Sequence, residues 1–303
     1  MIGDSTIGLI VGSSPRILHG NMLTVAIVGA GDIGGACAHA LAARDDVDRI
    51  VLIDRAAGAA AGKALDIKQS GAIAGLHVDL VGTDDWSRVA GCAVCVVADR
   101  FGPGSPEWRG EDGLVLVGQL ARACGEAPIV LAGATQEALA AAAVREARVQ
   151  RRRVIATAPE AFGAAVAAMV AMEAECSATE VSLAVLGVPP DALVVPWSGA
   201  SIGGYPLEAV LPPARVARIE ARVARLWPPG PFALGAAAAR VVSGLLASDR
   251  RTYNVLIVLD GEFGARNRLG TVPAVLGPLG IASTRVPPLN SRERVRVDIA
   301  LGA

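Results

Sequence analysis

Val25-Ala-Ile-Val-Gly29-Ala-Gly31-Asp32-Ile33-Gly34 is the stretch of sequence that decides the fold. An apolar, mostly β-branched run leads into glycines spaced as G-x-G-x-x-G, and a helical, alanine-rich pattern follows. In such a strand–turn–helix unit Gly29 permits the tight turn, Gly31 lets the backbone approach a pyrophosphate, and Gly34 lets the helix pack on the strand. The helix N-terminus adds free N–H groups and the positive end of a dipole. The stretch therefore predicts a dinucleotide-binding turn; the alternative is a glycine-rich turn without a ligand.

A carboxylate follows at the spacing that such a turn requires. Asp54 ends the next predicted strand, twenty residues after Gly34. It can accept a hydrogen bond from a ribose 2′-hydroxyl and would repel a 2′-phosphate, so NAD is favoured over NADP, although the neighbouring Arg55 weakens that preference. The residues expected to bind the cofactor are Gly29, Gly31, Asp32, Ile33, Gly34, Asp54 and, after the fourth strand, Val97, Ala98 and Asp99.

Short β-branched runs alternate with alanine-rich helical stretches as far as residue 156. We expect strands at 24–28, 49–53, 77–81, 93–97, 128–132 and 153–156, and helices at 33–43, 59–70, 113–124 and 136–147. Strict alternation predicts a parallel sheet with right-handed crossovers and helices on both faces. The sequence therefore predicts an α/β fold: a Rossmann-type, doubly wound parallel sheet over residues 22–156, preceded by an extension at residues 1–21.

The pattern changes beyond residue 157. Helices are expected at 160–175, 213–226 and 233–248, strands at 253–259 and 271–276, and a hairpin of 180–186 with 192–195 across a Pro-Pro turn. Mixed helices and antiparallel strands are typical of an α+β domain. We expect that domain to span residues 157–303 and, because no long linker precedes it, to share a tight interface with the first.

The composition argues against several classes of partner. The 303 residues carry a formal net charge of −1, which gives no electrostatic footprint for nucleic acid. No apolar run reaches the ~18 residues of a membrane span. The five cysteines form no secreted disulfide framework. Cys92 and Cys95 lie in an apolar run expected to be a strand, where residues three apart face opposite sides and share no metal. These features favour a reducing cytoplasm and no metal site.

Four further motifs follow in chain order. They are Gly62-Lys-Ala-Leu-Asp-Ile67, Gly82-Thr-Asp-Asp-Trp86, Val195-Pro-Trp-Ser198 and Leu259-Asp-Gly-Glu-Phe-Gly264. With them the chain resembles the lactate/malate dehydrogenases from residue 22 to about residue 300. The resemblance implies an NAD-dependent oxidoreductase of 2-hydroxy acids that forms a homodimer or homotetramer. It also implies a histidine base, an aspartate that orients it, two arginines that contact the substrate, and an asparagine.

Most of these groups are missing where the resemblance places them. Pro189 stands at the histidine position, Phe162 and Ala165 at those of the aspartate and the first arginine, and Gly133 at that of the asparagine. All three histidines lie before residue 78, and residues 156–214 contain no His, Lys or Arg. Only Arg109, in the Pro/Gly-rich loop 99–112, matches the second, catalytic arginine; a solvated loop arginine is the alternative.

Two acidic residues depart from the family pattern in different ways. Asp99 replaces a glycine near the cofactor phosphates, where a carboxylate would be repulsive unless Arg100 neutralised it. Asp191 follows the lost histidine and is interpreted as a turn residue rather than a replacement base. The expected substrate pocket is apolar and uncharged, so a 2-oxo acid would enter it with its charge unpaired.

Three hypotheses for the function remain open. The first is an NAD(H)-binding relative whose lactate or malate turnover is doubtful and whose substrate, a small molecule that the sequence does not name, is less charged. The second is a catalytically silent NAD-binding sensor or partner subunit. The third is a conventional dehydrogenase with unrecognised replacement groups. In each case the alanine-rich helices at 34–43 and 160–172 are expected to support self-association.

Overall fold

The structure is a computed structural model that describes residues 22–104 and 106–302. The extension expected at residues 1–21 lies outside the described residues. Six parallel strands form the first half of the main sheet, in the order β3-β2-β1-β4-β5-β6. They are β1 (Thr24–Val28), β2 (Arg49–Ile53), β3 (Asp79–Thr83), β4 (Val94–Val97), β5 (Ile129–Leu131) and β6 (Val154–Ala156). The expected parallel sheet is confirmed.

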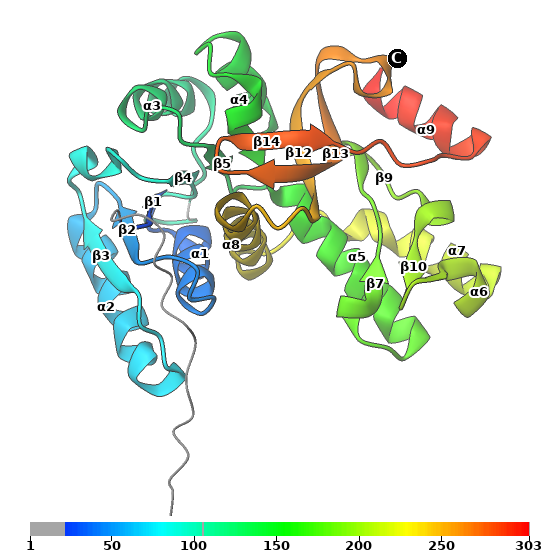
Figure 1. Ribbon diagram of the computed structural model, residues 1–303, viewed down its shortest axis with the longest axis horizontal. Helices are drawn as coiled ribbons and strands as arrows, with labels where there is room; N and C mark the ends of the chain where they lie inside the picture. Colours follow the sequence, from blue (N-terminus) through cyan, green and yellow to red (C-terminus); the bar gives the residue numbers. More distant parts are fainter. Residues whose placement is uncertain (1–21, 105, 303) are drawn as a thin grey trace, which may run out of the picture.

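Helices cover both faces of these strands (Figure 1). On one face α1 (Asp32–Ala42), α2 (Ala57–Ala74) and α8 (Pro231–Ala247) share a hydrophobic core with Val25 and Ile27. On the other face α3 (Gly110–Ala123) and α4 (Glu137–Arg145) share a second core with Ala26 and Val28. Alternate residues of β1 thus enter opposite cores, as the two-residue period of a strand requires. The carboxyl ends of the parallel strands meet at one edge, where the predicted site lies.

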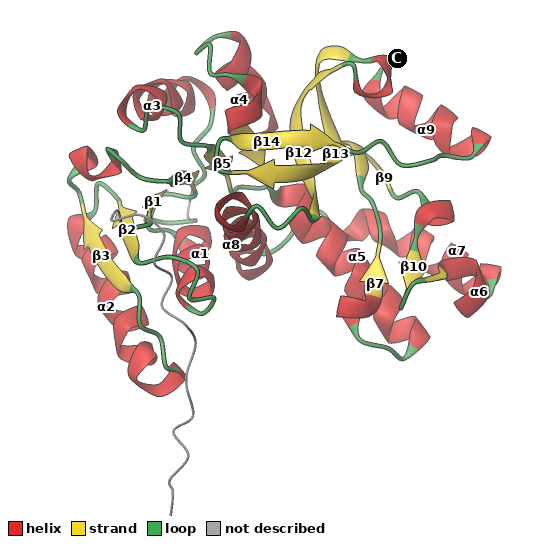
Figure 2. Cartoon of the chain, viewed as in Figure 1, coloured by secondary structure: helices red, strands yellow, loops and turns green. Residues whose placement is uncertain are grey.

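The main sheet continues into the C-terminal half with antiparallel strands (Figure 2). β12 pairs with β6 at Leu256 and Ala156, and β13, β8 and β9 follow in that order, with β14 paired to β13. Their bounds are Thr252–Asp260 (β12), Arg266–Gly277 (β13), Leu186–Val188 (β8), Ala192–Val194 (β9) and Gly280–Thr284 (β14). The expected α+β second part is present, and these five strands extend the first sheet.

The hairpin around the Pro-Pro turn is shorter than expected. Leu186–Val188 pairs with Ala192–Val194, and the Pro189–Pro190 bond between them is cis. The expectation that residues 180–186 form one arm was wrong, because β7 (Val181–Ser182) pairs with β10 (Ser201–Ile202) in a separate small sheet. That sheet is completed by β11 (Tyr205–Pro206). Helices α5 (Ala158–Ala174), α6 (Leu207–Val210), α7 (Pro213–Val223) and α9 (Ser291–Leu301) complete the C-terminal half.

The small residues of α1 bring it into close contact with α8 of the same chain. A methyl group built on Gly235 of α8 would lie 2.6 Å from the Cβ of Ala36. Consequently α1 leaves few side chains exposed, chiefly Asp32 and His39. The small residues of α1, one of the two helices expected to support self-association, therefore pack against α8 of the same chain.

Within the described residues no single helix is long and apolar enough to cross a membrane. One pair, Pro213–Leu226 with Pro231–Ala247, reaches that length and composition only when taken together across a 97° bend.

Candidate functional site

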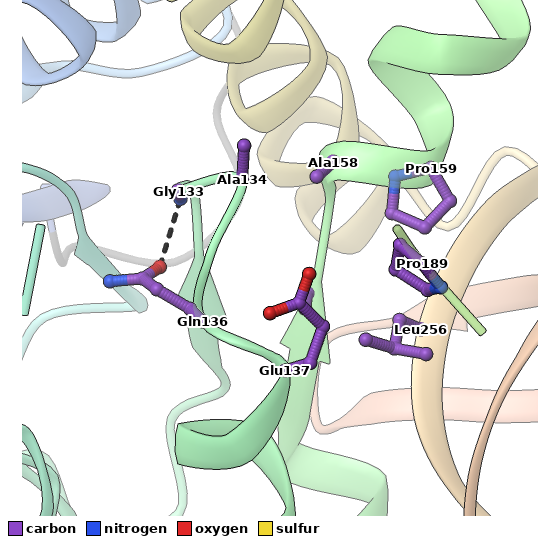
Figure 3. Close-up of a pocket in the computed structure, with 9 residues that line it drawn as sticks. Gly133, Ala134, Gln136, Glu137, Ala158, Pro159, Pro189 and Leu256 are labelled. Atoms are coloured by element: carbon purple, nitrogen blue, oxygen red, sulfur yellow. Dashed lines mark hydrogen bonds between the residues drawn. The ribbon is translucent and has the colours of Figure 1, made fainter. Parts of the chain in front are cut away.

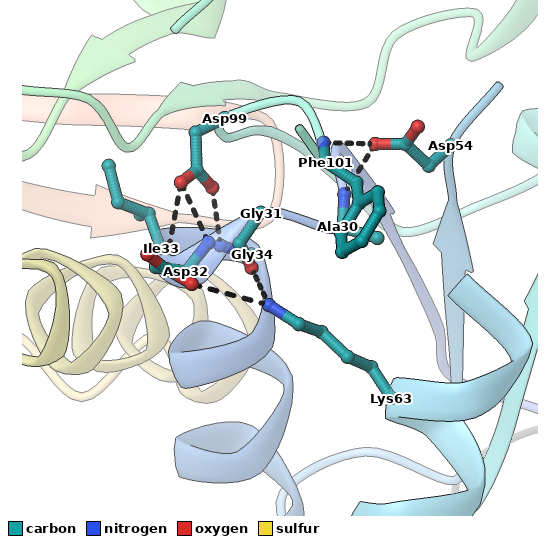
Figure 4. A network of polar contacts seen from close by, with 9 residues as sticks. All are labelled: Ala30, Gly31, Asp32, Ile33, Gly34, Asp54, Lys63, Asp99 and Phe101. Atoms are coloured by element: carbon teal, nitrogen blue, oxygen red, sulfur yellow. Dashed lines mark hydrogen bonds and ion pairs between the residues drawn. The ribbon is translucent and has the colours of Figure 1, made fainter. Parts of the chain in front are cut away.

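The glycine turn after β1 holds a carboxylate from its own chain (Figure 4). Oδ2 of Asp99 accepts hydrogen bonds from the backbone N–H of Asp32 at 2.8 Å and of Ile33 at 3.1 Å. Oδ1 accepts one from Gly34 N–H at 2.9 Å. These N–H groups form the first turn of α1 and would otherwise lack partners within the helix. Asp99 thus occupies the place where the sequence predicts an anion of the cofactor.

The glycines of the turn are required by this contact. A methyl group on Gly31 would lie 2.4 Å from the Asp99 carboxylate, and one on Gly29 would lie 2.3 Å from the Asp99 carbonyl oxygen. Gly29 also has a φ of +112°, which favours glycine. Gly34 lets the helix approach the strand, as predicted, because a methyl group there would meet the Gly29 carbonyl at 1.9 Å. The spacing that admits a pyrophosphate therefore equally admits Asp99.

Asp54 is similarly occupied by main-chain donors. Its Oδ2 accepts hydrogen bonds from Ala30 N–H at 2.8 Å and from Phe101 N–H at 2.9 Å. Its Oδ1 accepts one from Ala56 N–H at 3.0 Å. The carboxylate is buried at the end of β2, where the sequence places it, and it ties the start of the β4–α3 loop to the glycine turn. Both oxygens of the carboxylate expected to face a ribose therefore have backbone partners in this conformation.

The negative charge of Asp99 is stabilised by the helix rather than by Arg100. Burial raises the pKa of the Asp99 carboxyl, while the N–H groups of Gly34, Ile33 and Asp32 act in the opposite direction. Arg100, named from the sequence as the residue that could neutralise this charge, is placed elsewhere: its guanidinium lies 4.8 Å from the Trp108 ring and 3.7 Å from an oxygen of Asp112. The dipole of α1 and its free N–H groups supply the stabilisation instead.

The other residues expected at the cofactor site differ in burial and in their contacts. Val97 and Ala98 are buried at the end of β4, and Ala98 N–H donates to the Val28 carbonyl at 2.9 Å. The exposed side chain of Asp32 lies 3.7 Å from Nζ of Lys63, and Lys63 also donates to the Gly31 carbonyl. Lys63 was not predicted to belong to this site; its place in the Gly62–Ile67 motif was the available signal.

A second carboxylate from the same loop fills the turn after β5. Glu107 accepts hydrogen bonds from Ala134 N–H at 2.9 Å and from Thr135 N–H at 2.8 Å, and from the Thr135 hydroxyl at 2.7 Å. A methyl group on Gly133 would lie 2.3 Å from Oε2 of Glu107. Gly133 is the position at which the family resemblance implies an asparagine. The Glu107 carboxylate occupies the space into which that side chain would project.

The cleft beside Pro189 is small and contains no positively charged side chain (Figure 3). It is lined by Gly133, Ala134, Gln136, Glu137, Ala156, Ala158, Pro159, Pro189 and Leu256. The gap between these side chains is too narrow to admit a water molecule. The expectation of an uncharged pocket was wrong in one respect, because the Glu137 carboxyl faces the cleft. Burial, together with the nearby Glu107, raises the pKa of Glu137.

The other positions singled out in the sequence lie outside this cleft. Pro190, Asp191 and Phe162 line a separate cavity of about 210 Å³ with Trp197 and Trp227. Asp191 lies in an exposed turn, as interpreted. Arg109 is exposed at the N-cap of α3 and is not among the residues that line the cleft. Its catalytic role stays a prediction.

The turn in this conformation does not fit the pyrophosphate of NAD. The N–H groups of Asp32, Ile33 and Gly34 that would hold it already donate to Asp99, and Gly31 N–H donates to the Asp99 carbonyl at 2.9 Å. A second anion here would face a buried carboxylate with no donor left to separate them. Binding of the cofactor's pyrophosphate at this turn therefore requires Asp99 to move.

Three cysteine thiols gather in the core between the sheet and α3. Cys92, Cys95 and Cys124 are buried in the same cluster of side chains. Hydrogen bonds among them raise the pKa of Cys92 and Cys95 and lower that of Cys124. The expectation of opposite faces was wrong because β4 begins at Val94, so Cys92 precedes the strand. No group of three His, Cys, Asp or Glu in the part of the chain that the structure describes could hold a metal ion.

Comparisons with known proteins agree with the architecture. Residues 23–122 match the family model described as lactate/malate dehydrogenase, NAD binding domain. The malate dehydrogenase of Desulforudis audaxviator is 28% identical over 297 residues, covering 92% of this chain and 95% of that protein. That of Cytophaga hutchinsonii is 29% identical over 293 residues, covering 91% and 94%. The structure of malate dehydrogenase from Salinibacter ruber superposes with a TM-score of 0.83 at 23% identity, covering 92% and 94% of the two chains. That likeness concerns the fold.

Proposed function

The chain belongs to the lactate/malate dehydrogenase family, and we propose that it is a member that binds NAD(H) but does not turn over a 2-hydroxy acid at an ordinary rate. Its N-terminal part is the family's NAD-binding domain. The observation that carries the proposal is the cleft at Pro189. It has no room for a water molecule, no cation in its lining, and proline where the resemblance implies histidine.

Proton transfer is the first missing function. Oxidation of a 2-hydroxy acid requires a base for the hydroxyl proton, and losing one costs roughly 10²–10⁴ in rate. His39 is exposed near the end of α1, and His77 precedes β3 at the amino end of the parallel strands. The cleft lies beyond the carboxyl ends of those strands, so neither imidazole faces it.

Binding of the substrate carboxylate is the second missing function. Family members need an arginine that grips the carboxylate with two parallel hydrogen bonds. The cleft instead presents Glu137, and Glu107 occupies the turn at Gly133. A 2-oxo acid would place its negative charge beside these carboxylates, which is unfavourable in a water-excluding site. A closed cleft favours the silent sensor or partner subunit over a dehydrogenase with a different substrate.

A steady-state assay tests the proposal. NADH oxidation is followed by absorbance with saturating oxaloacetate and, separately, pyruvate. We expect turnover below about 0.1 s⁻¹, two orders of magnitude under the ~10 s⁻¹ median of enzymes. The matched variant is Arg109→Ala, which removes the one side chain that matches a family catalytic group. A wild-type rate near the median that collapses in Arg109→Ala would show that the family's chemistry survives.

Self-association in the cytoplasm is part of the proposal. Exposed apolar side chains on three helices support it: Leu65 and Ile73 on α2, Met172 on α5 and Phe232 on α8. Large exposed apolar residues of this kind often mark protein–protein contacts. Sedimentation at micromolar concentration should give a species heavier than the 30.7 kDa chain; a monomer would contradict this part.

A further inference from the structure

The loop between β4 and α3 contacts both turns of the predicted site at once. We propose that this loop is an internal occupant of the site: Asp99 takes the place of the cofactor's pyrophosphate, and a dinucleotide binds only after the loop has moved. The loop is called here the occluding loop, residues 99–104 and 106–108. The inference rests on the proposed function in one respect, that the ligand competing with Asp99 is NAD(H).

Asp99 reproduces the chemistry of a bound phosphate. It presents two anionic oxygens to three consecutive N–H groups at a helix N-terminus, at distances of 2.8, 2.9 and 3.1 Å. Charge-assisted hydrogen bonds of this kind are about twice as strong as neutral ones. The residue is 1% exposed, so water does not replace these contacts. Figure 4 shows both carboxylate oxygens directed at the turn.

Glu107 holds the other end of the loop in the same manner. Asp99 and Glu107 are joined by an antiparallel bridge, and Arg100 N–H donates to the Pro106 carbonyl at 2.9 Å. The loop therefore crosses from the turn after β1 to the turn after β5 as one braced unit. At each end a carboxylate accepts hydrogen bonds from backbone N–H groups beside a glycine. Because it is held in this way at both ends, the loop differs from a mobile lid that rests on the surface.

Trp108 fixes the loop on its outer side. Its buried ring lies beneath two guanidinium groups, 5.9 Å from Cζ of Arg55 and 4.8 Å from Cζ of Arg100. Arg55 directly follows Asp54, so the ring lies near the carboxylate expected to bind the adenine ribose. Phe101 N–H already occupies that carboxylate. The loop thus covers the adenosine side as well as the phosphate side.

If the occluding loop must move before a dinucleotide binds, the affinity for the cofactor depends on the fraction of molecules in which the loop has moved away from the glycine turn (open molecules). A ligand that binds only a minor conformation has its apparent dissociation constant raised by the inverse of that fraction. Removing the Asp99 carboxylate leaves the N–H groups of the turn unpaired and shifts the population toward open molecules. Asp99→Gly should therefore bind NADH more tightly than the wild type, although it removes a residue from the site.

Calorimetric titration of the full chain tests this with two probes, NADH and inorganic pyrophosphate. We expect Asp99→Gly to bind NADH at least about tenfold more tightly than wild type, with Asp99→Asn in between. Pyrophosphate should bind Asp99→Gly and not the wild type. The matched control is Asp84→Asn, which removes one exposed carboxylate after β3, at the same edge of the sheet. It should change NADH affinity by less than about twofold, because surface charges are screened.

The two probes separate failure of the inference from failure of the proposed function. Equal NADH affinity in wild type and Asp99→Gly, or an equal gain in Asp84→Asn, overturns the inference and leaves NAD(H) binding intact. If Asp99→Gly binds pyrophosphate but not NADH, the result supports an anion site at the glycine turn and overturns the proposal that the ligand is NAD(H). No pyrophosphate binding by Asp99→Gly or Asp99→Asn, in samples whose circular dichroism matches wild type, overturns the inference.

Discussion

Carboxylates that fold back onto backbone N–H groups recur throughout this molecule. Asp99 and Glu107 do so at the two turns of the site, and Glu293 does so where α9 begins. Oε1 of Glu293 accepts from Ser198 N–H at 3.0 Å, and Oε2 accepts from the Ser198 hydroxyl at 2.5 Å and from Asn290 N–H at 3.1 Å. One side chain thereby caps α9 and fastens it to the turn after β9.

This capping carboxylate should make stability depend on pH. Burial alone would raise the pKa of Glu293, but the hydrogen bonds from Ser198 and Asn290 lower it overall. The folded state therefore binds its proton less readily than the unfolded chain, whose pKa is about 4.3. The stabilisation is present above that value and is lost as the pH falls through the folded pKa.

Glu293→Gln tests the prediction by urea unfolding at about pH 7 and at about pH 3. We expect a loss of about 1–3 kcal/mol near neutrality, since hydrogen bonds to a charged group are removed, and a much smaller loss in acid. Glu126→Gln, at an exposed pair 3.6 Å from Arg152, is the matched control and should change little. The same loss at both pH values would mean that the charge of Glu293 plays no part.

At the scale of single residues, the sequence predicted where the glycine turn and Asp54 lie but not which groups they contact. The strand–turn–helix pattern placed Gly29, Gly34 and Asp54 where the structure has them, because local spacing determines a tight turn. The partners of Asp54 and Asp99 could not be derived, because they depend on the path of a loop between residues 99 and 108. The available signal was that Asp99 replaces a glycine. It suggested repulsion between the carboxylate and the cofactor phosphates, not hydrogen bonds from the glycine turn to the carboxylate.

At the scale of elements, long periodic helices and buried strands were predicted well and short elements were not. β4 begins at Val94 instead of residue 92 or 93, which was enough to reverse the expected sides of Cys92 and Cys95. β7 does not pair with residues 192–195 as expected, because a two-residue strand has too short a hydrophobic pattern to determine its register. The helix α9 was missed because charged residues dominate it, although its capping box, Asn290 with Glu293, is a recognisable start signal.

At the scale of the whole molecule, the fold and the contents of the candidate site point in different directions. The fold is similar to that of the malate dehydrogenase from Salinibacter ruber, which covers 92% of this chain. The occluding loop nevertheless inserts carboxylates at both turns, and the cleft beside Pro189 is closed. Global architecture follows from hydrophobic patterning, which the sequence displays. The occupied turns depend instead on Asp99 and Glu107, two carboxylates that lie far along the chain from the turns they contact.

Hydrogen exchange of single backbone amides tests most directly whether the chain fills its own site. N–H groups in the first turn of a helix normally exchange fast, because they have no intrahelical acceptor. In the wild type without ligand we expect the amides of Asp32, Ile33 and Gly34 to be protected, and those of the first turn of α3, which has no side-chain cap, to exchange fast. In Asp99→Gly the three protected amides should exchange as fast as that reference. Exchange in the wild type that already matches the first turn of α3 would contradict the occluded site.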